Sequence, residues 1–104
     1  MKIIWSDFAR AMLKDIYYYH KEVAGIPIAQ KIRDRIFKTV RQLIKHPHSG
    51  QIEEFLLSLN EGHRYLISGN YKIIYKVFDK HILITDVFDT RQNPIKINNP
   101  KRNI

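Results

Sequence analysis

The spacing of hydrophobic residues predicts that the chain begins with a short strand followed by two helices. Residues 3–5 are β-branched and aromatic, which is typical of a strand. Apolar positions recur every three or four residues over residues 8–25, and a second stripe of the same period covers residues 28–46. Gly25 and Pro27 separate the two stripes. The short connection predicts an antiparallel helical hairpin, whose apolar faces need a sheet to pack against.

The second half of the chain has the period of strands. Residues 63–68, 71–78 and 81–88 each have the composition of a strand, and short turns connect them, so we expect antiparallel pairing. Residues 52–59 fit either a short strand or an irregular edge. The predicted fold class is α+β, with a short first strand and an antiparallel helical hairpin on one face of a small, mainly antiparallel sheet of three to four strands.

The length of 104 residues leaves room for one hydrophobic core. We therefore expect a single domain over residues 1–98. Regular structure is predicted to end at Asn99-Pro100, and Lys101 and Arg102 follow, so residues 99–104 are expected to form a flexible tail.

The charge of the chain limits the class of its partner. The formal net charge is +8 and the sequence pI is near 9.8, which favours nucleic acid, an anionic membrane surface or a carboxylate-rich protein. The alternative is a solvated basic surface that serves only solubility.

The location of the protein follows from what the sequence lacks. It contains no cysteine, which excludes disulfides and thiolate chemistry and fits a reducing compartment. No apolar run approaches the roughly 20 residues of a membrane span. Asp7 and Arg10 interrupt the first apolar run, unlike a secretory signal. We expect a soluble, cytoplasmic protein without a membrane partner.

Most candidate catalytic groups have an ordinary structural explanation. His46 and His48 flank a proline in a turn and have no third ligand nearby, so no metal site is expected. Glycine is too scarce for a phosphate-binding loop, and no cofactor is expected. Glu53 or Glu54 would supply a general base if it faced a basic cleft; otherwise the two belong to a solvated loop.

A set of basic residues on the predicted strands is the strongest candidate site. Arg64, Lys72, Lys76 and Arg91 fall on neighbouring strands or at the end of the last one. Because side chains alternate along a strand, Lys72 and Lys76 share one side with Ile74, and we expect Arg64, Lys72 and Arg91 to gather on the open face of the sheet. Such a cluster suits phosphate contact. The alternative is a set of ordinary solvent-side residues that discourage edge aggregation.

The order of the elements and three short motifs carry a resemblance to a known family. The chain has a strand, a helical hairpin, a P-x-x-G turn at residues 47–50, the hairpin sequence G-N-Y-K-I-I-Y at residues 69–75, and a last strand followed by D-T-R at residues 89–91. This order resembles the RelE/ParE superfamily of bacterial type II toxin-antitoxin toxins. The resemblance covers nearly the whole chain, and the hairpin and the D-T-R segment are its most specific parts.

The resemblance implies one of two activities. RelE-like toxins are ribosome-dependent endonucleases that cut messenger RNA, using basic residues to stabilise the phosphate. ParE-like toxins instead poison DNA gyrase without cutting nucleic acid themselves. Members of both groups are held inactive by a cognate, acidic antitoxin, so the resemblance implies a complex with such a protein.

The residues of a RelE-like active site are only partly present. Lys72 stands where RelE-like enzymes place an arginine, Arg64 lies close to a basic position, and Arg91 matches the basic residue after the last strand. Glu53 or Glu54 falls roughly where some relatives carry a carboxylate base. If the protein is a nuclease, the resemblance therefore implies Lys72, Arg91, Arg64 and Glu54 as its catalytic residues.

Two departures from the nuclease pattern favour the ParE-like interpretation. Asp89-Thr90 replaces a histidine found near that position in several nucleases, and Ile97 occupies the approximate place of a late catalytic tyrosine. An obvious acid to protonate the leaving oxygen is therefore missing. The prediction is a toxin that targets gyrase; a RelE-like messenger RNA endonuclease and a non-toxic basic nucleic-acid-binding module stay open as alternatives.

Overall fold

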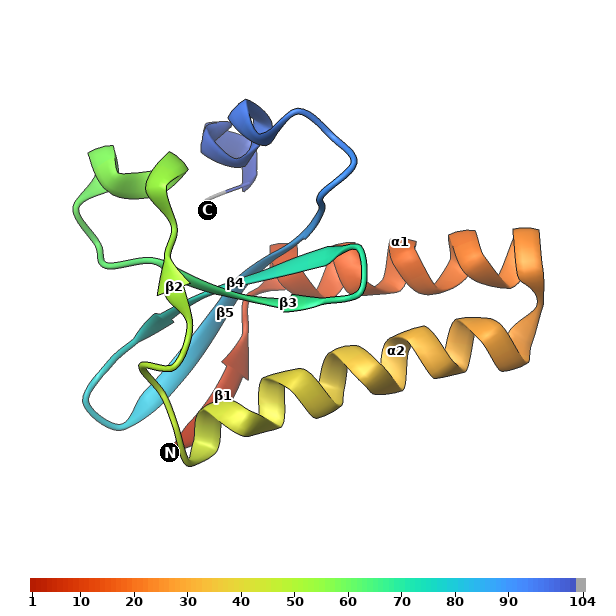
Figure 1. Cartoon of the computed structure of the whole chain (residues 1–104), viewed down its shortest axis with the longest axis horizontal. Helices are drawn as coiled ribbons and strands as arrows, with labels where there is room; N and C mark the ends of the chain where they lie inside the picture. Colours follow the sequence, from red (N-terminus) through yellow and green to blue (C-terminus); the bar gives the residue numbers. More distant parts are fainter. Residues whose placement is uncertain (103–104) are drawn as a thin grey trace.

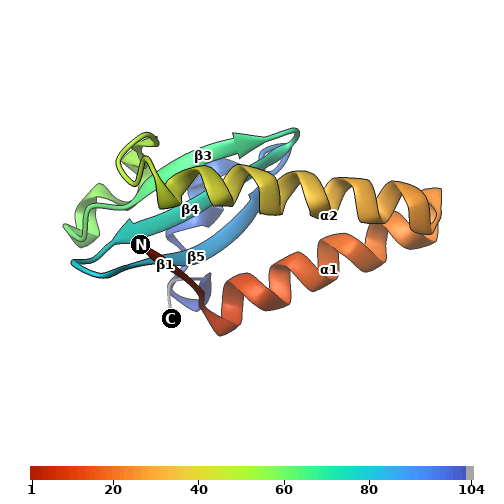
Figure 2. The ribbon, with the colours of Figure 1, turned by 90° about the horizontal axis from the view of Figure 1, so that it is seen from below.

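The structure consists of one mixed sheet with a helical hairpin on one of its faces (Figures 1 and 2). It is a computed structural model that describes residues 1–102. The strand order is β1-β5-β4-β3-β2; β1 runs parallel to β5, and all other neighbours are antiparallel. The elements are β1 Lys2–Trp5, α1 Asp7–Ala24, α2 Ile26–Arg41, β2 Gln51–Ile52, β3 Arg64–Ser68, β4 Tyr71–Val77 and β5 His81–Asp89. The predicted α+β class and the helical hairpin are confirmed.

Local sequence signals set the ends of the two helices. The side chain of Ser6 accepts a hydrogen bond of 3.0 Å from the backbone N–H of Ala9, which caps α1. Gly25 has φ of 91°, a conformation that favours glycine, and it separates α1 from α2 within a single residue. Because the break is so short, the helices run side by side in opposite directions (Figure 2). The helix predicted to reach residue 46 ends at Arg41 and continues as a 3-10 turn, Gln42–Ile44.

The sheet has five strands where the sequence predicted three to four. The three predicted strands of the second half are present as β3, β4 and β5. The first strand, β1, pairs in parallel with β5, and the two-residue β2 extends the other edge. Most of residues 52–59, for which a short strand or an irregular edge was predicted, forms a 3-10 helix, η2 (Glu54–Leu59).

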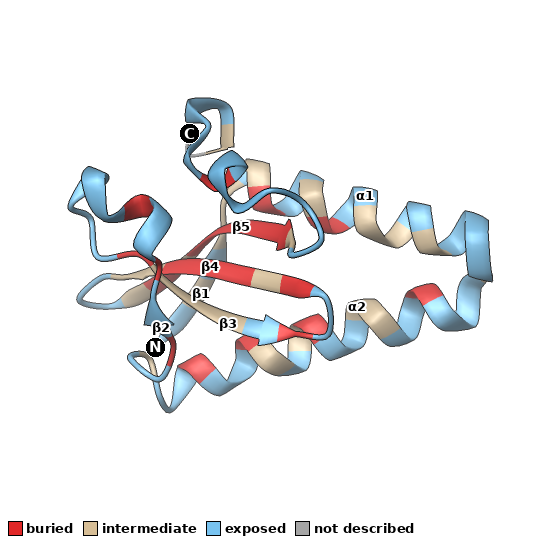
Figure 3. Ribbon diagram, turned by 45° about the horizontal axis from the view of Figure 1, so that its top comes forward, coloured by how far each residue is buried: buried red, intermediate tan, exposed pale blue. Residues whose placement is uncertain are grey.

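Hydrophobic side chains are buried on both faces of the sheet. The larger cluster lies between the sheet and the helical hairpin, and the smaller one, on the other face, joins Leu56 of η2, Ile74, Phe88 and Ile97. Ile97 belongs to a 3-10 helix after β5, η3 (Pro94–Asn98). The prediction of an open second face is therefore wrong over β4 and β5, whose residues are mostly buried in Figure 3. The 3-10 helices η2 and η3 cover this face, because Leu56 and Ile97 pack against Ile74 and Phe88 and remove these apolar side chains from water.

The flexible tail expected over residues 99–104 stays a prediction. Within its described part, Pro100–Arg102 form a 3-10 turn, η4, and residues 103–104 lie outside the described residues. The guanidinium of Arg102 donates to both carboxylate oxygens of Asp86, at 2.9 and 2.8 Å. This end of the chain thus contacts the centre of β5.

In the part of the chain that the structure describes, no helix combines the length and the apolar character needed to cross a bilayer.

Candidate functional site

Lys72 is the central residue of the predicted basic set, and it is neutralised by a buried carboxylate. It lies on β4, on the face away from the helical hairpin, and its Nζ is 2.9 Å from Oε2 of Glu53. The side chain of Glu53 is 1% exposed and that of Lys72 is 14% exposed. The other carboxylate oxygen of Glu53 accepts a hydrogen bond of 3.2 Å from the backbone N–H of Phe55, which caps η2. Glu53 therefore holds both the lysine and the start of η2.

A shallow cavity of about 170 Å³ lies beside this ion pair. Nζ of Lys72 is 4.2 Å from the centre of the Tyr65 ring, which is a cation–π contact. The hydroxyl of Tyr65 donates to the side-chain oxygen of Gln51 at 3.0 Å. Glu54 is exposed and contributes to the wall. The lining residues are Gln51, Ile52, Glu53, Glu54, Phe55, Tyr65 and Lys72. An anion entering here would have to compete with Glu53 for the lysine.

Arg64 lies on the opposite face of the sheet from Lys72. Its neighbour Tyr65 contacts Lys72, whereas Leu66 packs against the helix-side core, so alternation along β3 places Arg64 on the helix side. Nη1 of Arg64 donates to the backbone carbonyls of His48 at 3.3 Å and Gly50 at 2.8 Å. Arg64 thus braces the loop that precedes β2.

Arg91 follows β5 and binds its own neighbour Asp89. Nε and Nη2 of Arg91 donate to the two oxygens of Asp89 at 3.0 and 2.7 Å, and the backbone N–H of Arg91 donates to the same carboxylate at 2.9 Å. These hydrogen bonds hold the pKa of Asp89 below its usual range and raise the pKa of Arg91. The guanidinium is solvent-exposed but electrostatically balanced.

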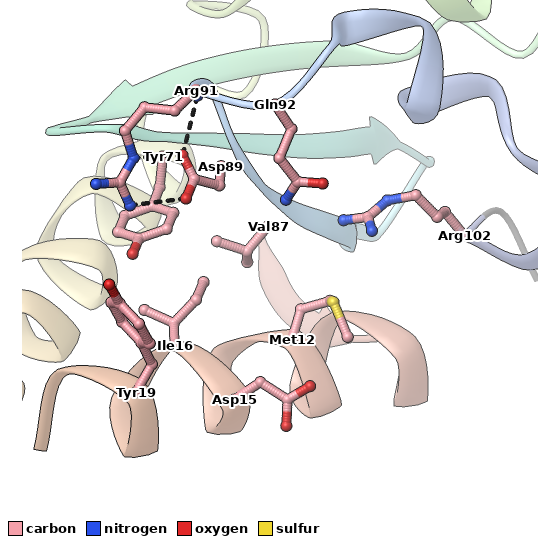
Figure 4. Close-up of a pocket in the computed structure, with 10 residues that line it drawn as sticks. All are labelled: Met12, Asp15, Ile16, Tyr19, Tyr71, Val87, Asp89, Arg91, Gln92 and Arg102. Carbon is pink, nitrogen blue, oxygen red and sulfur yellow. Dashed lines mark hydrogen bonds and ion pairs between the residues drawn. The ribbon is translucent and has the colours of Figure 1, made fainter. Parts of the chain in front are cut away.

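A cavity beside Arg91 lies between α1 and the end of β5 (Figure 4). It measures about 390 Å³, and its apolar floor includes Met12, Ile16 and Val87. Arg91 and Arg102 stand on opposite sides of it in Figure 4. The remaining lining residues are Asp15, Tyr19, Tyr71, Asp89 and Gln92. Arg91 therefore belongs to a helix-side cavity that does not include Lys72.

The prediction that Arg64, Lys72 and Arg91 gather on one open face is wrong. The structure brings Lys72 together with Glu53 and Glu54 but places both arginines elsewhere. Each of the three cations also has a carboxylate or carbonyl partner within 3.0 Å. Their catalytic roles stay a prediction, and that prediction loses the convergent geometry on which it depended.

The buried side chains of Tyr71 and Asp86 and the half-buried side chain of His20 were not part of the predicted site. His20 and Tyr71 share a hydrogen bond of 2.7 Å between Nε2 and the hydroxyl, and burial and the nearby Asp89 raise the pKa of Tyr71. Asp86 is 1% exposed and binds Arg102. Asp86 lies inside the apolar run of β5, and a buried carboxylate requires a partner. The sequence therefore contained a signal that Asp86 would form an ion pair.

Among residues 1–102, no group of three or more His, Cys, Asp or Glu side chains is arranged to hold a metal ion.

Known proteins resemble this chain in both sequence and fold. Residues 3–94 match the family described as "ParE toxin of type II toxin-antitoxin system, parDE". The chain is similar to Toxin ParE1 of Caulobacter vibrioides, with 31% identity over 72 residues, which cover 69% of this chain and 72% of that toxin. It also has the fold of a chain in a solved structure described as a chromosomal ParDE TA system from P. aeruginosa. There the TM-score is 0.71 and the identity 24%, over 86% of this chain and 95% of that one.

Proposed function

This chain belongs to the ParE toxin family of type II toxin-antitoxin systems, and we propose that it inhibits growth by binding DNA gyrase. In this proposal the toxin acts as a binding protein and performs no bond cleavage of its own. Its partner in the resting cell is the cognate antitoxin, an acidic protein that complements the net charge of +8.

One observation supports gyrase binding over RNA cleavage. A nuclease without a metal must aim several cations at one phosphate, where they stabilise the charge that develops in the transition state. Here Lys72 binds a buried carboxylate on one face of the sheet, while Arg64 and Arg91 bind a carbonyl and a carboxylate on the other. Each missing donor costs about 3 kcal/mol of transition-state stabilisation, so cleavage would be slower by orders of magnitude.

The experiment that tests this proposal uses purified toxin, DNA gyrase, ATP and relaxed plasmid. We expect the toxin to inhibit supercoiling in proportion to its concentration, and premixing with the antitoxin to restore it. Unchanged supercoiling at a large excess of folded toxin would contradict the proposal. If expression of the chain also left growth unchanged, the non-toxic binding-module interpretation would replace it.

The messenger RNA endonuclease is the second candidate, because Lys72, Glu54 and Tyr65 line one cavity. Such a cavity could place a cation, a carboxylate and a hydroxyl around an RNA backbone. Incubation of the toxin with programmed ribosomes tests it directly. Cleaved transcript that disappears on Glu54→Gln would favour this candidate, and intact transcript would remove it.

A further inference from the structure

The outward face of α2 carries a continuous row of basic side chains. Exposed cations recur there at intervals of three or four residues and continue into the 3-10 turn that follows the helix. They are Lys31, Arg35, Lys38, Arg41 and Lys45. Because residues three and four apart are neighbours on a helix, these five form one ridge, the α2 ridge.

The α2 ridge points away from the body of the protein. Ile36, Val40 and Leu43 belong to the core between the helical hairpin and the sheet. With 3.6 residues per turn, the ridge residues lie on the opposite side of the helix from these three. In Figure 2 α2 lies in front of the sheet, and no other described element covers it. The ridge is therefore open along its whole length, which is about 20 Å at the helical rise per residue.

The charge of the α2 ridge is not balanced by nearby carboxylates. Among the described residues, no ridge cation belongs to an ion pair, whereas Lys72 and Arg91 each bind a carboxylate. The one carboxylate of α2, Asp34, lies 3.6 Å from Nε of Arg33. Residues 26–45 contain six Lys or Arg and one Asp, so they contribute +5 to the formal net charge of +8. Most of the net charge of the chain therefore comes from α2 and the turn after it.

The scarcity of apolar side chains on this face decides the class of its ligand. Between Lys31 and Arg41 no large hydrophobic residue is exposed, and the nearest that are, Ile28 and Ile44, lie outside these bounds. A protein interface depends on apolar and aromatic anchors at its centre. A nucleic-acid backbone is instead bound mainly by Lys and Arg, which displace its counterions. The ridge therefore suits a phosphate backbone better than a peptide.

The shape of the ridge favours duplex DNA among nucleic acids. Its cations are held in a straight row on a helix, and duplex DNA presents one negative charge per about 1.7 Å of its axis in an equally regular array. The major groove of B-form DNA is about 12 Å wide and admits an α-helix. The major groove of an RNA duplex is deep and narrow and does not admit one.

We propose that the α2 ridge binds the phosphate backbone of duplex DNA, with the outward face of α2 against the major groove. Because phosphate contacts carry no sequence information, this binding is independent of the DNA sequence. The contact is made by the face of the hairpin that points away from the sheet, so it uses none of the basic residues on the strands. The proposal goes beyond the inhibition of gyrase and does not depend on it.

Fluorescence anisotropy of a labelled DNA duplex, titrated with the full-length toxin at several salt concentrations, provides the first test. Each phosphate contact contributes about 0.9 to the slope of log K against log salt, so we expect a slope of about −4. Two duplexes of unrelated sequence should bind equally. A toxin that does not bind the duplex at low salt would overturn the proposal. Equally tight binding of a poly-glutamate peptide of the same charge, or tighter binding of an RNA duplex, would also overturn it.

Two matched triple variants provide the second test. The first removes three lysines of the ridge, Lys31→Gln/Lys38→Gln/Lys45→Gln. The control removes the same charge from exposed lysines elsewhere, Lys14→Gln/Lys80→Gln/Lys96→Gln. All six residues are exposed, and none belongs to an ion pair among the described residues, so both variants should fold.

The two variants are expected to differ in both affinity and salt dependence. The ridge variant should bind the duplex at least about tenfold more weakly than wild type, with a slope reduced by about 3, while the control keeps the wild-type slope. Equal losses in the two variants would show that the net charge acts diffusely and would overturn the proposal. Neither assay contains gyrase, so the failure of this proposal and that of gyrase inhibition are measured separately.

Discussion

Arg102 and Asp86 form a two-pronged ion pair that ties the last described turn to the centre of β5. Nε and Nη2 of Arg102 lie 2.9 and 2.8 Å from the two oxygens of Asp86. The guanidinium is also 5.0 Å from the ring centre of Phe8 and 5.1 Å from that of Phe88. This contact joins α1, β5 and the end of the chain, and it closes one side of the cavity that contains Arg91.

Removal of the arginine should destabilise the protein in a pH-dependent way. Arg102→Met leaves Asp86 buried without its partner, so we expect a loss of about 3–5 kcal/mol in the free energy of unfolding at pH 7. Burial raises the pKa of Asp86 above its ordinary value of 3.8, and Arg102 opposes that rise. Without Arg102 the pKa rises further, and an acid whose folded pKa is raised destabilises the fold as pH increases past the unfolded value.

Urea unfolding at pH 4 and pH 7 measures this effect. The difference in stability between wild type and Arg102→Met should be largest at pH 7 and should shrink toward pH 4, where Asp86 takes up a proton. The control is the double variant Asp86→Asn/Arg102→Met, which removes both charges and should recover much of the stability at pH 7. An equal loss at both pH values would refute the role of Asp86.

Lys72 should contribute to the free energy of unfolding through its ion pair with Glu53. Lys72→Met leaves the carboxylate of Glu53, which is 1% exposed, without its cation, and we expect a loss of about 3 kcal/mol in the free energy of unfolding. The double variant Glu53→Gln/Lys72→Met keeps the oxygen that accepts from Phe55 and should regain most of the loss. Guanidinium unfolding compares the three proteins. A Lys72→Met protein as stable as wild type would show that the pair contributes little.

Gly50 is required because two polar atoms approach it closely. A Cβ at this position would lie 2.5 Å from the hydroxyl of Tyr75 and 2.6 Å from the carbonyl of Tyr65. Gly50→Ala should also disturb the hydrogen bond of 2.9 Å from its N–H to the Tyr75 hydroxyl, and we expect a total cost of about 2–4 kcal/mol. Thermal unfolding measures it as a lower Tm. Ser49→Ala, at the exposed neighbour, is the control and should change Tm little; a similar Tm for both would contradict the packing argument.

His63 should make the fold sensitive to mild acid. Its side chain is buried, and burial lowers its pKa below the ordinary 6.5, with a further contribution from Lys76. A histidine whose folded pKa is lowered stays neutral in the native state while the unfolded chain takes up a proton. Its contribution to stability is therefore present above pH 6.5 and is lost as pH falls below that value.

Two measurements test this account of His63. Chemical unfolding of wild type should show stability falling between pH 7 and pH 5, and His63→Phe should flatten this dependence. In an NMR titration, Lys76→Met should raise the pKa of the His63 imidazole, because it removes a nearby positive charge. An imidazole that titrates at or above 6.5 in the wild-type protein would disprove the assignment.

The local pattern of the sequence was sufficient to predict most elements of the fold. A period of 3.6 residues predicted both helices, and a single glycine with a positive φ confirmed where the hairpin turns. The turn of Gly69-Asn70 fixes the register of β3 on β4, pairing Ser68 with Tyr71 and Ile67 with Lys72. These signals are local, and each depends on neighbours within a few residues along the chain. The same motifs carried the resemblance that the family match confirmed.

The same register shows where the prediction of the site failed. Ile67 is opposite Lys72, so the two side chains lie on the same face, and alternation along β3 places Arg64 on the other face. The pairing predicted from the Gly69-Asn70 turn was therefore sufficient to show that Arg64 and Lys72 lie on different faces. The position of Arg91 was harder to predict, because it lies beyond the last strand, where alternation no longer applies. Its partner Asp89 is two residues away and was visible in the sequence.

The sequence by itself determined the two helices, the strands β1, β3, β4 and β5, their order, the antiparallel meander and the family, because these follow from local periodicity and from motifs. Only the tertiary structure decided that β1 pairs in parallel with β5, that Lys72 binds Glu53 and that Arg102 returns to Asp86. These contacts join residues far apart in the chain, and each forms because a buried apolar strand or a buried charge needs a partner. The sequence shows that a buried charge or apolar strand needs a partner. Which residue becomes that partner depends on how the elements pack together.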